Sequence, residues 1–186
     1  DEVVLATGVT PRIPDVPGID QPMGVTYLDL LRDHVWVGDT VVIMGAGGIG
    51  FDVAEYLTQS GPSGAMDPAA FNAEWGIDPT YANRGGVVPA QPEKPARKVF
   101  LLQRKDSKVG AGLGRTTGWI HRTQLAARGV AFVAGVQYDR IDDAGLHVTV
   151  GERSTVLAAD TIVLATGQEP NRDLYAALQA SGVDVR

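Results

Sequence analysis

The chain has 186 residues with a hydrophobic fraction of 44%, a formal net charge of −6 and no cysteine. This length can bury the core of one domain, while the acidic balance disfavours nucleic acid as a partner and the lack of cysteine excludes disulfides and cysteine-ligated metals within the chain. No run approaches the ~20 apolar residues of a membrane span and no basic signal-peptide segment starts the chain, so we expect a cytoplasmic protein with no membrane partner.

The first predicted element is an apolar run that ends in Ala-Thr-Gly, and the same pattern returns near the end of the chain. Residues 1–8 read DEVVLATG and residues 160–167 read DTIVLATG, with six of the eight positions identical. Each run predicts a buried parallel strand that stops at a turn of small residues. Because the chain begins inside such a run and without Met, we expect it to be part of a longer polypeptide.

A short helix, a strand and a longer helix follow in that order. We predict the short helix around 26–33 and the strand at 40–44, and in the longer helix Ile49, Val53 and Leu57 share one face. Residues 61–97 then hold six of the eleven prolines and five glycines. This composition predicts an insertion that is mostly loop, with one helical turn near 71–75.

Strands and helices alternate again after the insertion. The pattern predicts strands at 99–103 and 130–134 with a helix at 116–128 between them, a second Ala-Thr-Gly strand, and a last helix at 173–180. Three short antiparallel strands are predicted at 136–141, 146–150 and 155–157. The predicted fold class is therefore α/β, with a Rossmann-like parallel sheet and an antiparallel three-stranded meander.

The main candidate site is a glycine-rich turn between the strand at 40–44 and the helix that follows it. The pattern Gly-x-Gly-x-x-Gly in a strand–turn–helix context predicts dinucleotide binding by Gly45, Ala46, Gly47, Gly48, Ile49 and Gly50. Gly45 permits the tight turn, Gly47 lets a pyrophosphate approach the backbone, and Gly50 lets the helix pack against the strand. The alternative is a turn that serves packing alone.

The end of the next strand decides between NADP and NAD. Gly50 and Arg104 are 54 positions apart, and without the 37 residues of the insertion they are 17 apart, close to the ~20 of dinucleotide-binding folds. Arg104 and Lys105 can pair with the 2′-phosphate of NADP, and two such bonds of ~1.5–3 kcal/mol each would favour NADP by about a hundredfold or more. The alternative is Asp106 as the acid that binds the ribose hydroxyls of NAD.

Basic residues gather in the stretch that contains this strand end. Eight of the sixteen Lys and Arg residues lie between positions 97 and 128, with Asp106 as the one acid among them. A local basic patch on an acidic protein fits a small anionic ligand. We interpret Trp119 and Ile120 as core residues. The three histidines are scattered and no acid, base or nucleophile constellation appears, so we predict no catalytic and no metal-binding residue in the chain.

The motifs together resemble a known arrangement. The paired Ala-Thr-Gly strands on either side of a Gly-x-Gly-x-x-Gly turn are similar to the nested FAD and NADPH domains of glutathione-reductase-like flavoproteins. That resemblance implies an edge of the FAD domain at 1–20, an NADP(H)-binding domain at 21–164 and a return into the FAD domain at 165–186. It also implies that two residue pairs lie near FAD: Thr7 and Gly8, and Thr166 and Gly167.

Within that group the chain resembles the bacterial NADPH-dependent 2,4-dienoyl-CoA reductases, relatives of trimethylamine dehydrogenase and old yellow enzyme. The matching segments are NAEWGID at 72–78, QRK at 103–105, GLGRTTGWIHR at 112–122, DDAGLH at 142–147 and GQEPN at 167–171. The resemblance implies a longer enzyme of fatty acid metabolism that also holds FAD, FMN and a 4Fe-4S cluster and reduces a dienoyl-CoA. The FAD and barrel domains of the same polypeptide would be the partners of this chain.

Three alternatives stay open. A disulfide reductase would share the nested domains, but its redox cysteines are absent here. A trimethylamine-dehydrogenase-like relative would keep the domain yet bind only ADP, and another FAD/NAD(P)-dependent oxidoreductase is part of the same alternative. A non-catalytic dinucleotide-sensing module would bind the nucleotide without passing hydride to a flavin. A methyltransferase fits less well, because a basic strand end has no role on a neutral ribose.

Overall fold

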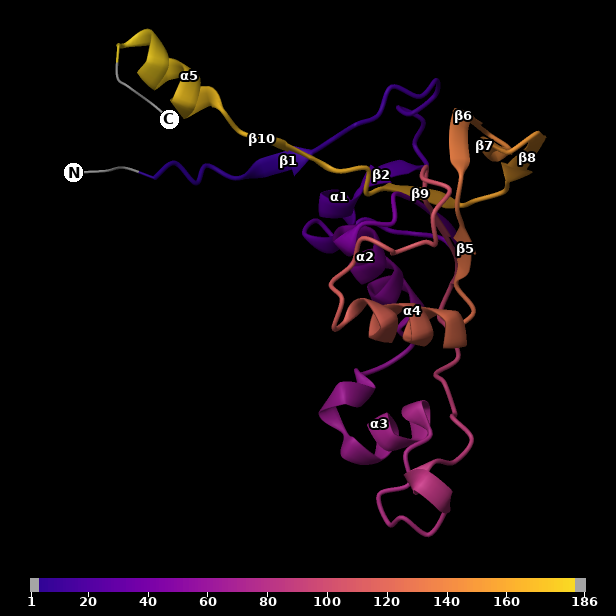
Figure 1. The fold of residues 1–186 in the computed structure, drawn as a ribbon. Helices are drawn as coiled ribbons and strands as arrows, with labels where there is room; N and C mark the ends of the chain where they lie inside the picture. The colour runs from indigo at the N-terminus through magenta and orange to yellow at the C-terminus, as the bar shows by residue number, and fades with distance from the viewer. Residues whose placement is uncertain (1–3, 183–186) are drawn as a thin grey trace.

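The computed structural model describes residues 4–182 and is built around a five-stranded parallel sheet (Figure 1). The strand order is β2-β9-β3-β4-β5, with bounds Gly24–Thr26 (β2), Thr161–Leu164 (β9), Thr40–Met44 (β3), Lys98–Leu102 (β4) and Ala131–Val133 (β5). The predicted fold class is confirmed. The strand at 40–44 has the predicted bounds. The edge strand β2 was not predicted, because three residues are too few to show an alternation of apolar and polar side chains.

One face of the sheet is covered by helices α1 (Tyr27–Leu31), α2 (Gly48–Thr58) and α4 (Gly118–Ala127). Side chains alternate along each strand, so Val41 and Ile43 of β3 point into the core on this face. Phe51 and Leu57 of α2 pack there with them, both almost fully buried. The helical periodicity that begins after the glycine turn therefore faces the sheet, as predicted.

The other face is covered by an antiparallel meander of β6 (Val136–Asp142), β7 (Gly145–Val150) and β8 (Arg153–Leu157). Val42 and Met44 point into this second core and pack with Leu146 and Val148 of β7. The meander thus occupies the face that carries helices in a doubly wound sheet, and the parallel sheet is buried on both sides.

The insertion forms a separate lobe beyond α4 (Figure 1). It contains helix α3 (Pro68–Trp75) between two 3₁₀ turns at Gly64–Met66 and Arg84–Gly86. The prediction of one helical turn near 71–75 was too short. Asp67 caps the helix through its side chain, and Gly76 ends it with φ of 67°, so the local signals Asp-Pro and Gly mark both ends of α3.

The two ends of the described chain run side by side, away from the sheet (Figure 1). β1 (Val9–Pro11) and β10 (Gln168–Pro170) form an antiparallel ribbon, and α5 (Asp173–Ala180) follows with the predicted bounds. The strand predicted at 1–8 is wrong for the part that is described: residues 4–8 lie outside any strand and Val4 is 87% exposed, while residues 1–3 lie outside the described range. Residues 4–8 pair with no strand in the described part of the chain, and a segment without a paired strand cannot form a ladder.

Across the described residues, no helix combines the length and the apolarity that crossing a membrane requires.

Candidate functional site

The glycine turn lies at the carboxyl end of β3, in the middle of the sheet. Gly45 has φ of 108°, and a Cβ atom there would lie 2.2 Å from the carbonyl oxygen of Ala165, at the end of β9. The Gly45 N–H donates to the carbonyl oxygen of Leu102, 3.0 Å away, at the end of β4. Close packing against both neighbouring strands therefore allows only glycine at this position.

Gly47 and Gly48 are the open part of the turn. A Cβ atom built on either would have no neighbour within 4 Å, so their backbone faces free space. Gly47 is the N-cap of α2 and makes no side-chain hydrogen bond, and the first turn of α2 carries no acidic residue. The N–H groups that begin a helix attract an anion. The residues present therefore fit the pyrophosphate of a dinucleotide.

The other two predicted turn residues, Ala46 and Ile49, have a supporting position. Both side chains are half-buried and pack against the core between the sheet and the helices. They hold the turn in place, and only their backbone atoms can face a ligand.

Arg104 and Lys105 lie just beyond the end of β4, next to the glycine turn. Both side chains are exposed, and in the described part of the chain neither takes part in an ion pair or a side-chain hydrogen bond. β3 and β4 pair in parallel register up to Met44 and Leu102. The turn and the basic strand end therefore meet at one edge of the sheet, as the dinucleotide pattern requires.

The side chain of Gln103 organises the loop that follows β4. Its Nε2 donates to the carbonyl oxygens of Lys105 at 3.1 Å and Ser107 at 2.8 Å, and its Oε1 accepts from the Gly110 N–H at 3.2 Å. Sequence reasoning placed Gln103 in a motif but gave it no role. An amide with both donors and acceptor used in one loop holds the backbone of that loop in place.

Tyr138 of β6 lies beneath the same turn. Its hydroxyl is buried and no hydrogen-bond partner satisfies it among the described residues. Burial raises the pKa of Tyr138 to about 12, against smaller opposing effects of the Arg104 guanidinium and of the Gly45 N–H. That N–H approaches the hydroxyl but donates its hydrogen bond to Leu102. The sequence offered no signal for this residue, because only the packing of the meander under the sheet brings it there.

The residues expected near FAD hold the two chain ends together. The Thr7 hydroxyl donates to the carbonyl oxygen of Asn171 at 2.6 Å, and the Thr166 hydroxyl donates to that of Arg12 at 2.8 Å. The carbonyl oxygens of Gly8 and Gly167 accept from the N–H groups of Asn171 and Arg12. Each Ala-Thr-Gly segment thus pairs with the stretch that follows the other one, at opposite ends of the β1–β10 ribbon, and Ala165 lies against the glycine turn.

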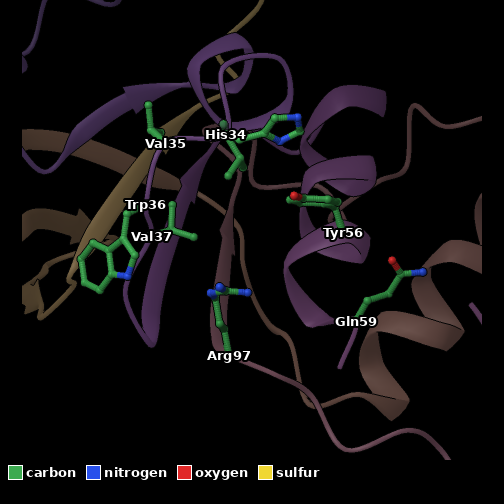
Figure 2. A pocket seen from close by; sticks show the side chains of 8 residues that line it. His34, Val35, Trp36, Val37, Tyr56, Gln59 and Arg97 are labelled. Atoms are coloured by element: carbon green, nitrogen blue, oxygen red, sulfur yellow. The ribbon is translucent and has the colours of Figure 1, made fainter. Parts of the chain in front are cut away.

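A separate cavity of about 340 Å³ lies at the amino ends of β3 and β4, opposite the glycine turn. Figure 2 shows Tyr56 and Gln59 of α2 on one side, Trp36 on the other and Arg97 between them. Because it opens at the opposite end of the sheet from the glycine turn, this cavity forms no part of the dinucleotide site.

The interpretation of Trp119 as a core residue was wrong. Its side chain is 54% exposed at the start of α4, whereas Leu125 of the same helix is 1% exposed. Helical periodicity distinguishes the apolar face of a helix from its polar face. It cannot show that α4 lies at the edge of the sheet, where no other element covers its first turn and Trp119 stays exposed.

Fold and site together define the class of protein: an α/β domain of the NAD(P)-binding type. The model of the family described as pyridine nucleotide-disulphide oxidoreductase matches residues 1–186, and the chain belongs to this family. The chain is similar to proteins named as reductases. A metal reductase of Desulforamulus reducens is 25% identical over 96% of the chain, and a mercuric reductase of Bacillus cereus is 22% identical over 98%.

The chain spans about a quarter of the length of these relatives, 26% and 24% respectively. Solved structures share its fold. A 2-naphthoyl-CoA reductase complex matches with a TM-score of 0.68 at 21% identity, over 93% of this chain and 21% of the other. The HOCl-induced flavoprotein disulfide reductase RclA of Escherichia coli matches with a TM-score of 0.59 at 20% identity, over 97% of this chain and 33% of the other.

These findings correct the more specific resemblance. The identification as a dienoyl-CoA reductase was wrong, because the family model and the curated relatives indicate pyridine nucleotide-disulphide oxidoreductases that include metal and mercuric reductases. The FMN and 4Fe-4S cluster implied by that resemblance lose their support with it. The matching segments belong to a dinucleotide-binding unit, and such a unit is combined with different electron acceptors in different enzymes. The family itself binds FAD and NAD(P).

Proposed function

We propose that this chain binds NADP(H) and delivers its reducing equivalents to FAD in a pyridine nucleotide oxidoreductase. One observation carries the proposal: the open Gly47–Gly48 backbone at the start of α2 lies at the same sheet edge as Arg104 and Lys105, which are exposed and pair with no acid among residues 4–182. An anion-binding helix start beside two free cations fits a dinucleotide with an additional phosphate.

In this proposal, the residues at the carboxyl ends of β3 and β4 bind different parts of the nucleotide. The N–H groups at the start of α2 bind the pyrophosphate, and Arg104 and Lys105 bind the 2′-phosphate. From the glycine turn the dinucleotide would extend away from Arg104 and Lys105. Its nicotinamide would then lie near Thr166 and Gly167, where β9 ends beside the turn. The nicotinamide supplies hydride to the flavin, and the protein contributes positioning and exclusion of water, with no acid or base required from this chain.

The paired chain ends define where FAD would lie. The hydrogen bonds of Thr7 and Thr166 join each Ala-Thr-Gly segment to the stretch that follows the other one, at Asn171 and Arg12. We propose that residues 1–20 and 165–186 belong to the FAD-binding unit, that residues 21–164 form the NADP(H) domain, and that the rest of the FAD unit in the same polypeptide is its partner.

The final electron acceptor is reduced outside this chain. Relatives named as metal and mercuric reductases support a reductase of this general kind. The chain has no cysteine, so a thiol that such a reaction used would come from elsewhere in the protein.

NAD and a sensing role are the competing assignments. In the NAD assignment Asp106, which is exposed in the loop after β4, would bind the ribose hydroxyls in place of Arg104 and Lys105. A sensing module would bind NADPH without reducing a flavin. Bleaching of the flavin absorbance on addition of NADPH to the flavin-loaded protein separates an oxidoreductase from a sensor.

Titration with NADPH and NADH tests the nucleotide preference. We expect NADPH to bind about a hundredfold more tightly, since two charge-assisted bonds contribute that much or more. Arg104→Glu should remove most of this preference, while Arg115→Glu, an exposed basic residue farther along the loop, should keep it. Equal affinities for both nucleotides before and after Arg104→Glu would end the NADP proposal.

A further inference from the structure

We propose that the adenine of the bound nucleotide stacks on Trp119, in a groove beside the basic strand end; this rests on the NADP(H) binding proposed above. The groove has a volume of about 590 Å³, within the ~300–1,000 Å³ of small-molecule sites. Its principal lining residues are Lys108, Val109, Trp119, Arg122, Phe132 and Ala134.

The groove borders the residues assigned to the 2′-phosphate. Ala134 lines it, and the next residue, Gly135, donates its N–H to the carbonyl oxygen of Lys105 at 2.9 Å. Lys108 lines it from the loop that the Gln103 side chain closes. A ribose held at Arg104 and Lys105 would therefore have its base within reach of this groove.

The direction of α4 places Trp119 at the correct end. α4 connects parallel strands β4 and β5, so it begins at the edge of the sheet where β4 ends. Trp119 is the second residue of α4 and lies at the edge that carries the glycine turn. Farther down the helix, Ala126 lines the other end of the groove.

The groove offers an exposed aromatic face, an apolar wall and a basic rim. Trp119 is 54% exposed, and among the described residues its ring has no aromatic partner: the stacked or tilted pairs are Phe51 with Phe132 and Phe71 with Trp75. The wall behind it is apolar, formed by Val109 and Phe132, and the rim is basic. Arg122 is fixed on this rim by a hydrogen bond from its Nη1 to the carbonyl oxygen of Gly110 at 2.9 Å.

An adenine nucleotide is the occupant that these features favour over a protein segment. Ala134 at the groove connects through Gly135 to Lys105. Lys108 and Arg122 of the groove complement the anionic ribose-phosphate that the base brings with it. Aromatic stacking recognises the flat face of a base without hydrogen-bond readout, and half-exposed Trp119 offers such a face.

Binding of 2′,5′-ADP, which carries adenine and the 2′-phosphate without nicotinamide, tests the proposal by calorimetry. Trp119→Ala should weaken binding about tenfold, because base–aromatic stacking contributes that much or more, and Trp119→Phe should retain most of the affinity. The control is Trp36→Ala, an 82% exposed tryptophan at the opposite end of the sheet, which should bind as the unmodified protein does. Equal affinities for Trp119→Ala and Trp36→Ala would overturn the assignment.

A second measurement does not depend on removing the ring. In a Trp36→Phe, Trp75→Phe variant, Trp119 is the one remaining tryptophan, and bound 2′,5′-ADP should protect its fluorescence from acrylamide. Unchanged quenching with saturating nucleotide would place the adenine elsewhere and leave the groove to another segment or partner. Failure of the unmodified protein to bind 2′,5′-ADP or NADPH at all would instead refute the proposed function.

Discussion

Gly45 and Gly50 are packed so closely that a Cβ atom on Gly50 would lie 2.0 Å from the carbonyl oxygen of Gly45. This contact joins the start of the turn to the first turn of α2, and it separates the glycines of the motif into two kinds. Gly45 and Gly50 serve the packing of the backbone, whereas Gly47 and Gly48 leave space for a ligand.

Alanine substitutions should therefore separate folding from binding. Gly50→Ala should lower the thermal unfolding temperature, because the added methyl group meets backbone that cannot move away without displacing α2. Gly47→Ala should leave that temperature nearly unchanged, since its Cβ meets no atom within 4 Å, and should weaken NADPH binding about tenfold or more by obstructing the pyrophosphate. Similar unfolding temperatures for the two variants would contradict the distinction.

Arg128 fastens the insertion to the core. Its side chain is 3% exposed and its Nη2 lies 2.9 Å from Glu74 Oε1 and 3.4 Å from Glu93 Oε2, two carboxylates of the insertion. Arg128→Met should destabilise the protein by about 3 kcal/mol, because it leaves partly buried carboxylates unpaired. Denaturant unfolding measures the loss, with Arg115→Met as an exposed control. Adding Glu74→Gln and Glu93→Gln to Arg128→Met should recover part of the loss, and the absence of any recovery would argue against the ion pairs as its cause.

The insertion should lose stability at acid pH, because protonation of Asp78 weakens the hydrogen bonds that its carboxylate accepts. Hydrogen bonds from the side chains and N–H groups of Thr80 and Asn83 hold the pKa of Asp78 well below its usual range. The folded state thus favours the carboxylate, so this stabilisation is present above the ordinary pKa of ~4 and is lost as the pH falls toward the folded-state value.

Hydrogen-exchange protection factors at the Thr80 and Asn83 amides measure this effect. They should fall between pH 6 and pH 3 in the unmodified protein and should be low at both values in Asp78→Asn. Asp67→Asn is the matched control, because asparagine caps a helix as well as aspartate does. Constant protection down to pH 3 would rule out the role of Asp78.

Tyr138 predicts a loss of stability at alkaline pH. Its pKa rises from 10.0 to about 12 on folding, so the folded protein keeps a proton that the unfolded chain loses. The resulting stability is complete below pH ~10 and disappears as the pH rises toward ~12. Tyr138→Phe should remove this part of the alkaline decline. At neutral pH it should cost little or stabilise by up to about 1 kcal/mol, since a hydroxyl without a partner is removed from the interior. A loss above 2 kcal/mol at pH 7 would reveal a hydrogen bond at this hydroxyl.

Local signals made much of the fold predictable. The strand at 40–44 and the helix at 173–180 have the predicted bounds, because period, flanking turns and glycines are all adjacent in sequence. The strand expected at 1–8 failed for the opposite reason. Residues 4–8 pair with no strand among residues 4–182, and an apolar pattern by itself cannot supply a partner.

The site was predictable in composition but not in arrangement. The turn at Gly45–Gly50 and the pair Arg104 and Lys105 followed from spacing once the insertion was removed. Spacing did not indicate the roles of Gln103, Tyr138 and Trp119. The hydrogen bonds of Gln103 within its loop, the burial of the Tyr138 hydroxyl and the exposure of the Trp119 ring all depend on which elements cover which positions.

The sequence by itself determined an α/β dinucleotide-binding domain, an insertion and a basic strand end, since these depend on residue types at short range. Only the tertiary structure decided that the meander buries the second face, that Arg128 is buried between two carboxylates, and that a groove opens beside Lys105. Each of these depends on contacts between segments far apart in the chain, and the free energy of such contacts depends on packing geometry that composition and period do not contain.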